Sequence, residues 1–86
     1  MKKKLLLYSL KGCGHCNNLK EKLNNLKIEY VNKDIDIYSN EYDKVCELLG
    51  TDFIPIVRIE NTWLVPEKDF NTIDECVEKI KNLIIN

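Results

Sequence analysis

The sequence predicts one α/β domain in which a four-stranded mixed sheet is flanked by three helices, in the chain order β-α-β-α-β-β-α. Its 86 residues are enough for one compact core and too few for two, so we assign residues 1–86 to a single domain. Four short stretches have the apolar or alternating pattern of strands, and three others repeat apolar residues at helical spacing. No repeat, linker or low-complexity segment interrupts them, so these elements fill the chain.

The first half of the chain has the pattern of a β-α-β unit. Residues Leu5 to Ser9 are almost continuously apolar, which predicts a strand buried on both faces. From Cys13 to Leu26, apolar residues recur at helical spacing and polar residues occupy the other face. Alternation from Ile28 to Asn32 predicts a second strand. Because a helix joins two short strands, we expect a parallel pair with a right-handed crossover.

Two further helices are indicated by their ends as well as by their periodicity. Ser39 and Asn40 are residue types that cap helix N-termini, and Gly50 suits a left-handed position after the C-terminus. Thr72 and Glu75 have the spacing of a capping box ahead of the last helix. In the helix that begins near Ser39, the face expected to be buried comprises Tyr42, Val45, Cys46 and Leu49. In the last helix, which follows Thr72, it comprises Ile73, Cys76, Val77, Ile80, Leu83 and Ile84.

Two more strands lie between these helices. Residues Ile56 to Ile59 and Thr62 to Val65 are joined at Glu60-Asn61, so we expect them to pair as an antiparallel hairpin. Ile54-Pro55 precedes the first of them and is a candidate cis-peptide bond. Proline is tolerated at a strand start in any case, so this interpretation depends on its combination with other features.

Composition and charge exclude several functional classes. The chain has 13 Lys and Arg against 14 Asp and Glu, a net charge of −1, which provides no attraction for nucleic acid or an anionic membrane. We interpret Lys2-Lys3-Lys4 as solvated residues ahead of a strand. The apolar run from Leu5 to Tyr8 is too short for a secretory signal or a membrane span. We expect a cytoplasmic protein that binds neither nucleic acid nor membrane, and we expect it to be a monomer.

The chemistry is concentrated in Cys13-Gly14-His15-Cys16, at the predicted junction of a strand and a helix. Cys13 and Cys16 are three residues apart, a spacing that places both thiols on one helix face within reach of a disulfide bond. The helix N-terminus stabilises a thiolate, so Cys13 is the predicted nucleophile, while Cys16, one turn further on the apolar face, is the resolving thiol with the higher pKa. An imidazolium at His15 makes the pair more oxidising. Gly14 leaves the backbone open to a closely approaching substrate.

The other two cysteines have a simpler interpretation. Cys46 and Cys76 fall on the apolar faces of predicted helices, so we interpret both as small buried hydrophobes. Trp63, in a predicted strand, is interpreted as a packing residue.

These motifs occur in an order that is found in a known family. Tyr8-Ser9 leads to the Cys13–Cys16 motif, and Thr51-Asp52-Phe53-Ile54-Pro55-Ile56-Val57 follows ahead of the hairpin. In both features, and in element order over nearly the whole chain, the sequence resembles the glutaredoxins of the thioredoxin superfamily. The resemblance implies a thioredoxin-like fold of glutaredoxin type and a cis Pro55 that packs against the dithiol. It also implies that the backbone of Ile54 pairs with the main chain of the substrate.

Two departures from the glutaredoxin pattern lie close to the dithiol. Gly14 and His15 stand where the family usually has Pro and Tyr, and this pair is similar to the active site of protein disulfide isomerases, which implies a less reducing potential. The family's basic residue ahead of the nucleophile falls on Leu10. Lys11, one place later, is therefore the residue that we expect to contact substrate.

The third departure is larger. The Gly-Gly-x-Asp stretch that holds one end of glutathione in the family aligns with Val65-Pro66-Glu67-Lys68, which lacks both glycines. Proline has no N–H and valine adds bulk at a position of close backbone approach. Lys68 and the helix start at Thr72 are the remaining candidates for binding a carboxylate.

Dithiol exchange is the predicted function. Cys13 would attack a protein or glutathione disulfide, and Cys16 would release the product as the Cys13–Cys16 disulfide closes. Glutathione or a flavin-dependent reductase would supply electrons, and ribonucleotide reductase is a candidate among the protein substrates. No tightly bound cofactor is predicted.

Two alternatives use the same fold. In one, Cys13, Cys16 and His15 hold zinc, or Cys13 from two chains holds an iron-sulfur cluster with glutathione. A closed zinc site needs four ligands, and no second Cys-x-x-Cys or His pair is present, so we predict no metal site. In the other, a non-catalytic surface around Ile54-Pro55 binds extended peptides, although such a domain has no need of the dithiol.

Overall fold

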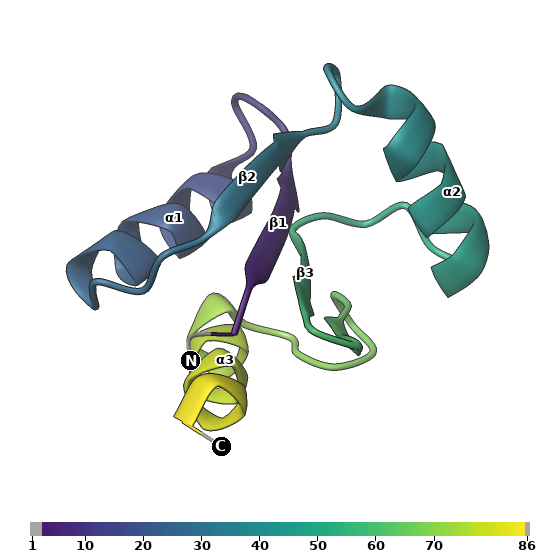
Figure 1. Ribbon diagram of the computed structural model, residues 1–86. Helices are drawn as coiled ribbons and strands as arrows, with labels where there is room; N and C mark the ends of the chain where they lie inside the picture. Colours follow the sequence, from purple (N-terminus) through teal and green to yellow (C-terminus); the bar gives the residue numbers. More distant parts are fainter. Residues whose placement is uncertain (1–2, 86) are drawn as a thin grey trace.

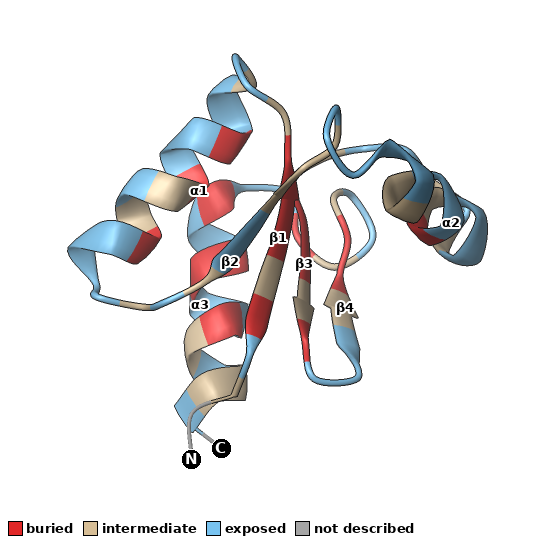
Figure 2. Ribbon diagram, turned by 45° about the horizontal axis from the view of Figure 1, so that its top comes forward, coloured by how far each residue is buried: buried red, intermediate tan, exposed pale blue. Residues whose placement is uncertain are grey.

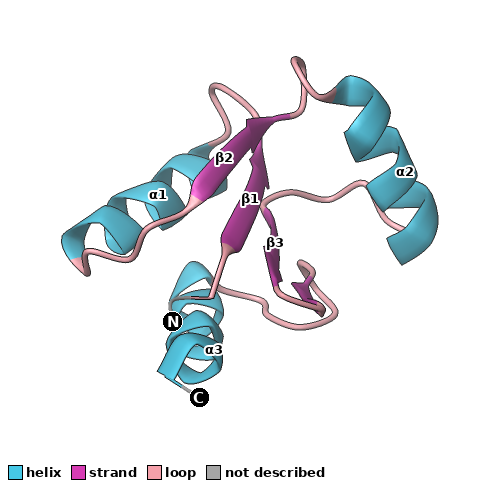
Figure 3. Cartoon of the chain, viewed as in Figure 1, coloured by secondary structure: helices cyan, strands magenta, loops and turns pink. Residues whose placement is uncertain are grey.

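The computed structural model describes residues 3–85 and has the predicted element order (Figures 1 and 3). β1 pairs in parallel with β2 and antiparallel with β3, and β3 pairs antiparallel with β4, giving a mixed sheet of order β2-β1-β3-β4. The predicted fold class is therefore confirmed. The elements are β1 (Leu5–Ser9), α1 (Gly14–Asn25), β2 (Val31–Asp34), α2 (Ser39–Leu49), β3 (Ile56–Ile59), β4 (Thr62–Leu64) and α3 (Ile73–Ile85).

The pleat of β1 divides the apolar core between the two faces of the sheet. Leu5 and Leu7 belong to the larger cluster, which they form with α1 and α3. Tyr8 belongs to a smaller cluster on the opposite face, with Val45 of α2 and Ile56. Figure 2 shows the buried positions gathered on β1, on β3 and on the sides of α1 and α3 that face the sheet. Two helices thus cover one face and α2 covers the other.

The second strand lies further along the chain than predicted. Instead of Ile28 to Asn32, β2 comprises Val31–Asp34, with Leu6 opposite Val31. The reason is the end of α1, where Lys27 has a φ of 57° and the N–H of Ile28 donates to the carbonyl of Leu23 at 2.9 Å. This Schellman-type cap uses the residues up to Ile28, so the strand can begin only after it. Ile28 and Tyr30 pack against the larger cluster, which explains their apolar character.

The start of α2 also differs from the prediction. Ser39 is the first helical residue, Tyr38 occupies the N-cap, and no side chain caps the helix. The N–H groups of Ile37 and Tyr38 both donate to the carbonyl of Asp34, so a turn leads directly into the helix. The predicted C-terminus is confirmed, because Gly50 has a φ of 72° and its N–H donates to the carbonyl of Cys46.

Two smaller differences concern the last strand and the lysine cluster. β4 ends at Leu64, and the N–H of Val65 donates to Oδ2 of Asp69 at 2.8 Å instead of extending the hairpin. Lys2 of the Lys2-Lys3-Lys4 cluster lies outside the described residues, and Nζ of Lys3 donates to the carbonyl of Leu83 at 2.7 Å. Across residues 3–85, none of the helices combines the length and apolar character needed to span a membrane.

Candidate functional site: a dithiol beside a groove

Cys13 lies at the point where the loop after β1 becomes α1. The N–H of Cys13 donates to the carbonyl of Leu10 at 3.1 Å, and Gly12 within this turn has a φ of 88°, a conformation that side chains rarely adopt. Cys13 is the N-cap residue, and its Sγ accepts the backbone N–H of Cys16 at 3.2 Å. The turn therefore positions this sulfur where a helix N-terminus stabilises negative charge.

Cys16 lies one turn inside α1 and is completely buried, whereas Cys13 is partly exposed. Burial, followed by the hydrogen bond with Cys13, raises the pKa of the Cys16 thiol from 9.0 to about 12. The two thiols are therefore different in environment, with one accessible at the helix end and one protected and held in the protonated form. All four cysteines are free thiols.

The other predicted residues of this loop are exposed. His15 is exposed in the first turn of α1, and Lys11 is exposed in the preceding turn. A Cβ built at Gly14 meets no atom within 4 Å, so the fold itself does not require glycine there. The backbone at Gly14 is accordingly accessible to an approaching molecule.

A groove of about 520 Å³ lies beside the dithiol and contacts three parts of the chain. The predicted residues His15, Ile54 and Pro55 all line it, and the Ile54–Pro55 bond is cis, as the resemblance implies. Cys13, Cys16, Lys11 and Gly14 are not among its lining residues. The structure thus brings His15 together with the Ile54-Pro55 segment and leaves Lys11 outside the groove.

Several lining residues were not anticipated from the sequence. Phe53, which is 52% exposed, adjoins Ile54 in the chain, and Asn18 and Lys22 lie three and seven residues after His15 on one helix face. Helical spacing from His15 was therefore a usable signal for Asn18 and Lys22. Pro66 and Glu67 belong to the stretch that aligns with the glutathione-binding Gly-Gly-x-Asp of the family. The lining residues that no local pattern connects to the dithiol are Phe70, Asn71, Ile73 and Asp74.

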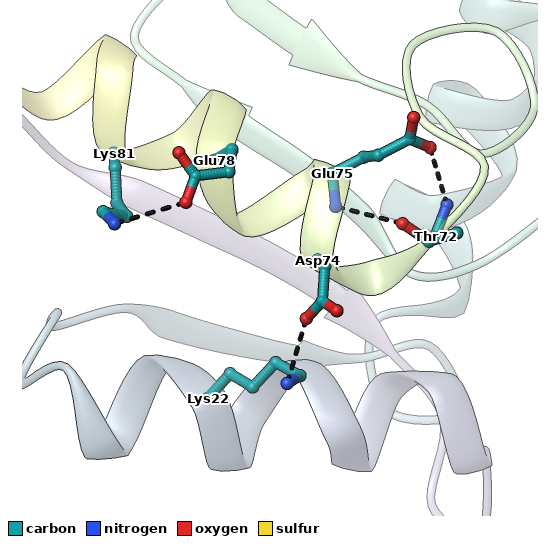
Figure 4. Close-up of polar contacts among 6 residues, drawn as sticks. All are labelled: Lys22, Thr72, Asp74, Glu75, Glu78 and Lys81. Carbon is teal, nitrogen blue, oxygen red and sulfur yellow. Dashed lines mark hydrogen bonds and ion pairs between the residues drawn. The ribbon is translucent and has the colours of Figure 1, made fainter.

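Charged and polar groups at the α3 side of the groove are engaged with one another (Figure 4). Nζ of Lys22 lies 3.0 Å from Oδ1 of Asp74, joining α1 to α3. The N–H of Glu75 donates to Oγ1 of Thr72 at 3.1 Å, and the N–H of Thr72 donates back to Oε1 of Glu75 at 3.0 Å, which confirms the predicted capping box. Hydrogen bonds from the backbone of Asn71 and Thr72 lower the pKa of Glu75.

The sequence suggested Lys68 and the helix start at Thr72 as groups that could bind a carboxylate, and the structure does not place either of them as expected. Lys68 does not line the groove, and its N–H donates to the carbonyl of Val65 within the loop before α3. The helix start at Thr72 does line the groove, but a carboxylate of the same chain already accepts its N–H. Lys68 is therefore not part of the groove, and the N–H of Thr72 already has a partner within the chain.

The remaining cysteines and Trp63 lie away from this groove. Cys76 is completely buried, as predicted, and burial raises its thiol pKa to about 12. Cys46 is only partly buried, because α2 buries little more than Val45. Trp63 stacks on Tyr8 with ring centroids 6.2 Å apart. Within residues 3–85, no group of three or more His, Cys, Asp or Glu side chains could hold a metal ion.

A mixed sheet covered by α1 and α3 on one face and α2 on the other, with a Cys-x-x-Cys pair at the start of α1, defines a thiol protein of thioredoxin-like fold. The glutaredoxin family model matches residues 5–64, from β1 to β4, and the chain belongs to this family. Membership of the family supports a thiol-disulfide oxidoreductase type of function. No curated protein sequence matches the chain.

Solved structures share the fold at low sequence identity. A glutaredoxin from Archaeoglobus fulgidus superposes with a TM-score of 0.71 at 22% identity, over 98% of this chain and 88% of its own. Holo glutaredoxin C1 from Populus tremula x tremuloides gives 0.68 at 21% identity, over 94% and 77%. A buckwheat glutaredoxin-glutathione complex gives 0.70 at 20% identity, over 96% and 73%.

Proposed function

We propose that the chain exchanges its Cys13–Cys16 dithiol with disulfides of other molecules. The observation that carries this proposal is the asymmetry of the pair, since Cys13 Sγ lies at the helix N-terminus and accepts an N–H while Cys16 is buried with a raised pKa. Such a pair provides an accessible attacking sulfur and a protected second thiol, which is what a two-step exchange requires.

In the first step, the Cys13 thiolate attacks one sulfur of a substrate disulfide, forms a mixed disulfide and expels the other substrate sulfur as a thiolate. In the second, Cys16 loses its proton and attacks the Cys13 sulfur, which closes the Cys13–Cys16 disulfide and releases the second substrate thiolate. Two electrons pass to the substrate. Two glutathione thiols, or a flavin-dependent reductase, then return the pair to the dithiol.

The roles of the neighbouring residues follow from their positions. His15 is exposed at the start of α1, where a positive imidazolium would stabilise the dithiol form. The backbone of Ile54, beside cis Pro55 in the groove, would pair with the substrate main chain, and exposed Phe53 would pack against it. Lys11 would contact substrate from outside the groove, and the space around Gly14 would admit it.

The partners and location are part of the same proposal. Protein disulfides, with ribonucleotide reductase among the candidates, are the proposed substrates, and the related fold of a buckwheat glutaredoxin-glutathione complex supports glutathione as a partner. The proposed setting is a monomer in the cytoplasm, a reducing compartment in which thiols stay available for exchange.

Cysteine variants test the exchange. We expect Cys13→Ser to abolish reduction of a protein disulfide, a loss of at least about a hundredfold, because no other thiol lies at the helix N-terminus. Cys16→Ser should still attack and should accumulate the mixed disulfide, which intact-mass spectrometry detects. Cys46→Ser, a thiol of α2, is the matched control and should retain activity. Normal turnover by Cys13→Ser would contradict the proposal.

A further inference from the structure

Residues 51–54 lie between α2 and Pro55, and they carry the groove surface that the proposed function assigns to the substrate main chain. Figure 1 shows the connection running from α2 to the sheet. Phe53 and Ile54 line the groove, and Phe53 is 52% exposed. The conformation of this segment therefore decides how an extended polypeptide is held beside the dithiol.

The segment has little support of its own. Residues 51–54 belong to no helix or strand, and no hydrogen bond joins their backbone to another backbone group of the described chain. The N–H of Phe53 donates to Oγ1 of Thr51 at 3.2 Å, which is a contact within the segment. The hydroxyl of Tyr42 in α2 donates to the carbonyl of Asp52 at 2.5 Å. Among residues 3–85, this is the one hydrogen bond that connects the segment to another element of the fold.

The side chain of Tyr42 is itself held by the core. It packs against the smaller core cluster, which comprises Tyr8, Val45 and Ile56, on the face of the sheet opposite α1 and α3. Burial, followed by the neighbouring Cys46 thiol, raises the pKa of Tyr42. The hydroxyl therefore keeps its proton and stays a hydrogen-bond donor, on a ring whose position does not depend on the segment.

We propose that Tyr42 is a positioning residue for polypeptide substrates, because its hydroxyl holds Asp52 and so fixes Phe53 and Ile54 where an extended chain meets them. This inference rests on the proposed dithiol exchange. Tyr42 does not line the groove, so it acts on the substrate only through the segment. A residue of α2, on the far face of the sheet, thus contributes to recognition at the dithiol.

Loss of the hydroxyl has different consequences for recognition and for chemistry. Without it, residues 51–54 sample more conformations, and the apparent affinity for an extended substrate falls with the fraction of molecules in the binding conformation. Tyr42 makes no hydrogen bond with Cys13 or Cys16, so the attack on a disulfide that does not reach the segment is unaffected.

The test compares two disulfides that differ in whether they carry a main chain. One is a capped, extended peptide whose single cysteine is disulfide-linked to 2-mercaptoethanol, and the other is bis(2-hydroxyethyl) disulfide. Exchange converts either of them to two thiols and the protein dithiol to the Cys13–Cys16 disulfide. Pre-reduced protein is mixed with each, and the second-order rate constant is measured in a single turnover, so that no electron donor is needed.

Tyr42→Phe removes the hydroxyl and keeps the ring in the core. We expect its rate constant with the peptide to fall about two- to tenfold, the effect of one hydrogen bond on the binding conformation. The rate constant with bis(2-hydroxyethyl) disulfide should stay unchanged and reports an intact dithiol. Backbone order parameters from NMR relaxation should fall at Phe53 and Ile54, which connects the loss of rate to the segment.

Tyr38→Phe is the matched control. It is the same substitution beside the same helix, at a tyrosine that is exposed and whose hydroxyl makes no hydrogen bond with residues 51–54. Its rate constants with both disulfides and its order parameters should equal those of the wild-type chain.

The outcomes separate this inference from the proposed function. If the wild-type chain reduces neither disulfide, dithiol exchange itself is wrong. Exchange stands and the role of Tyr42 is wrong if Tyr42→Phe slows both disulfides equally, slows neither, or leaves the order parameters unchanged. An equal loss in Tyr38→Phe would also contradict that role.

Discussion

At the scale of single residues, the two active-site thiols differ because they occupy different positions on the same helix. Cys13 is outside the first turn with a sulfur that accepts a backbone N–H, and Cys16 is beneath it among buried side chains. Spacing alone predicted this asymmetry, since the N-cap and the apolar face of a helix are three residues apart here. The sequence predicted the capping box of Thr72 and Glu75 but could not show that Thr72 lines the groove, because a capping pattern does not say what lies beside it.

A substitution of His15 tests its proposed effect on the reduction potential of the Cys13–Cys16 pair. In the proposed function His15 stabilises the dithiol form, so replacing it by alanine should destabilise the dithiol relative to the disulfide and make the pair more reducing. We expect the reduction potential to fall by about 20 mV, equivalent to about 1 kcal/mol for an exposed charge pair. Equilibration with glutathione buffers, read by mass shift after alkylation, measures it. Asn18→Ala, one turn along the same face, should leave the potential unchanged, and an equal fall in both variants would remove His15 from this role.

At the scale of elements, α2 is attached to the sheet differently from α1 and α3. Val45 is its buried residue, and a polar contact also connects the helix to the sheet, since the Tyr8 hydroxyl donates to Oε2 of Glu41 at 2.6 Å. Nζ of Lys33 lies 3.2 Å from the other oxygen of the same carboxylate. Burial, followed by the hydrogen bond to Glu41, raises the pKa of Tyr8 to about 12. This contact joins β1, β2 and α2 on the face opposite the groove.

Tyr8→Phe tests that contact while keeping the ring in the core. We expect the free energy of unfolding to fall by about 1–2 kcal/mol, the range for a hydrogen bond to a charged group that stays partly hydrated. Denaturant unfolding measures the change. Tyr38→Phe, which removes an exposed hydroxyl next to α2, should change stability by less than about 0.5 kcal/mol. Equal effects of the two substitutions would show that the Glu41 contact contributes nothing specific.

At the scale of the whole molecule, the larger core depends on a thiol that must stay neutral. Cys76 is completely buried between α3 and the sheet, and burial raises its pKa from 9.0 to about 12. Between these two values the unfolded chain loses a proton that the folded chain retains. The stability associated with Cys76 is therefore complete below about pH 9 and is lost as pH rises toward about 12.

A pair of core variants checks this dependence. Between pH 8 and pH 10, under reducing conditions, we expect the stability advantage of the wild-type chain over Cys76→Ala to shrink by about 1 kcal/mol. Val77→Ala creates a comparable cavity in the same helix without a titratable group, so its deficit relative to wild type should be the same at both pH values. A constant deficit for Cys76→Ala as well would mean that burial does not hold this thiol neutral.

The sequence by itself determined the order of elements, the start of α1 at the dithiol and the capping box of α3, because each depends on residues within one or two helical turns of one another. Tertiary structure decided where β2 begins. Lys27 adopts a left-handed backbone conformation, which is uncommon for lysine and could not be predicted from the residue type, and Ile28 packs against the core before the strand starts. It also decided what surrounds the dithiol. Phe53, Lys22 and Asp74 reach one groove only because packing of α1 against α3 brings distant segments together, and no local spacing encodes such contacts.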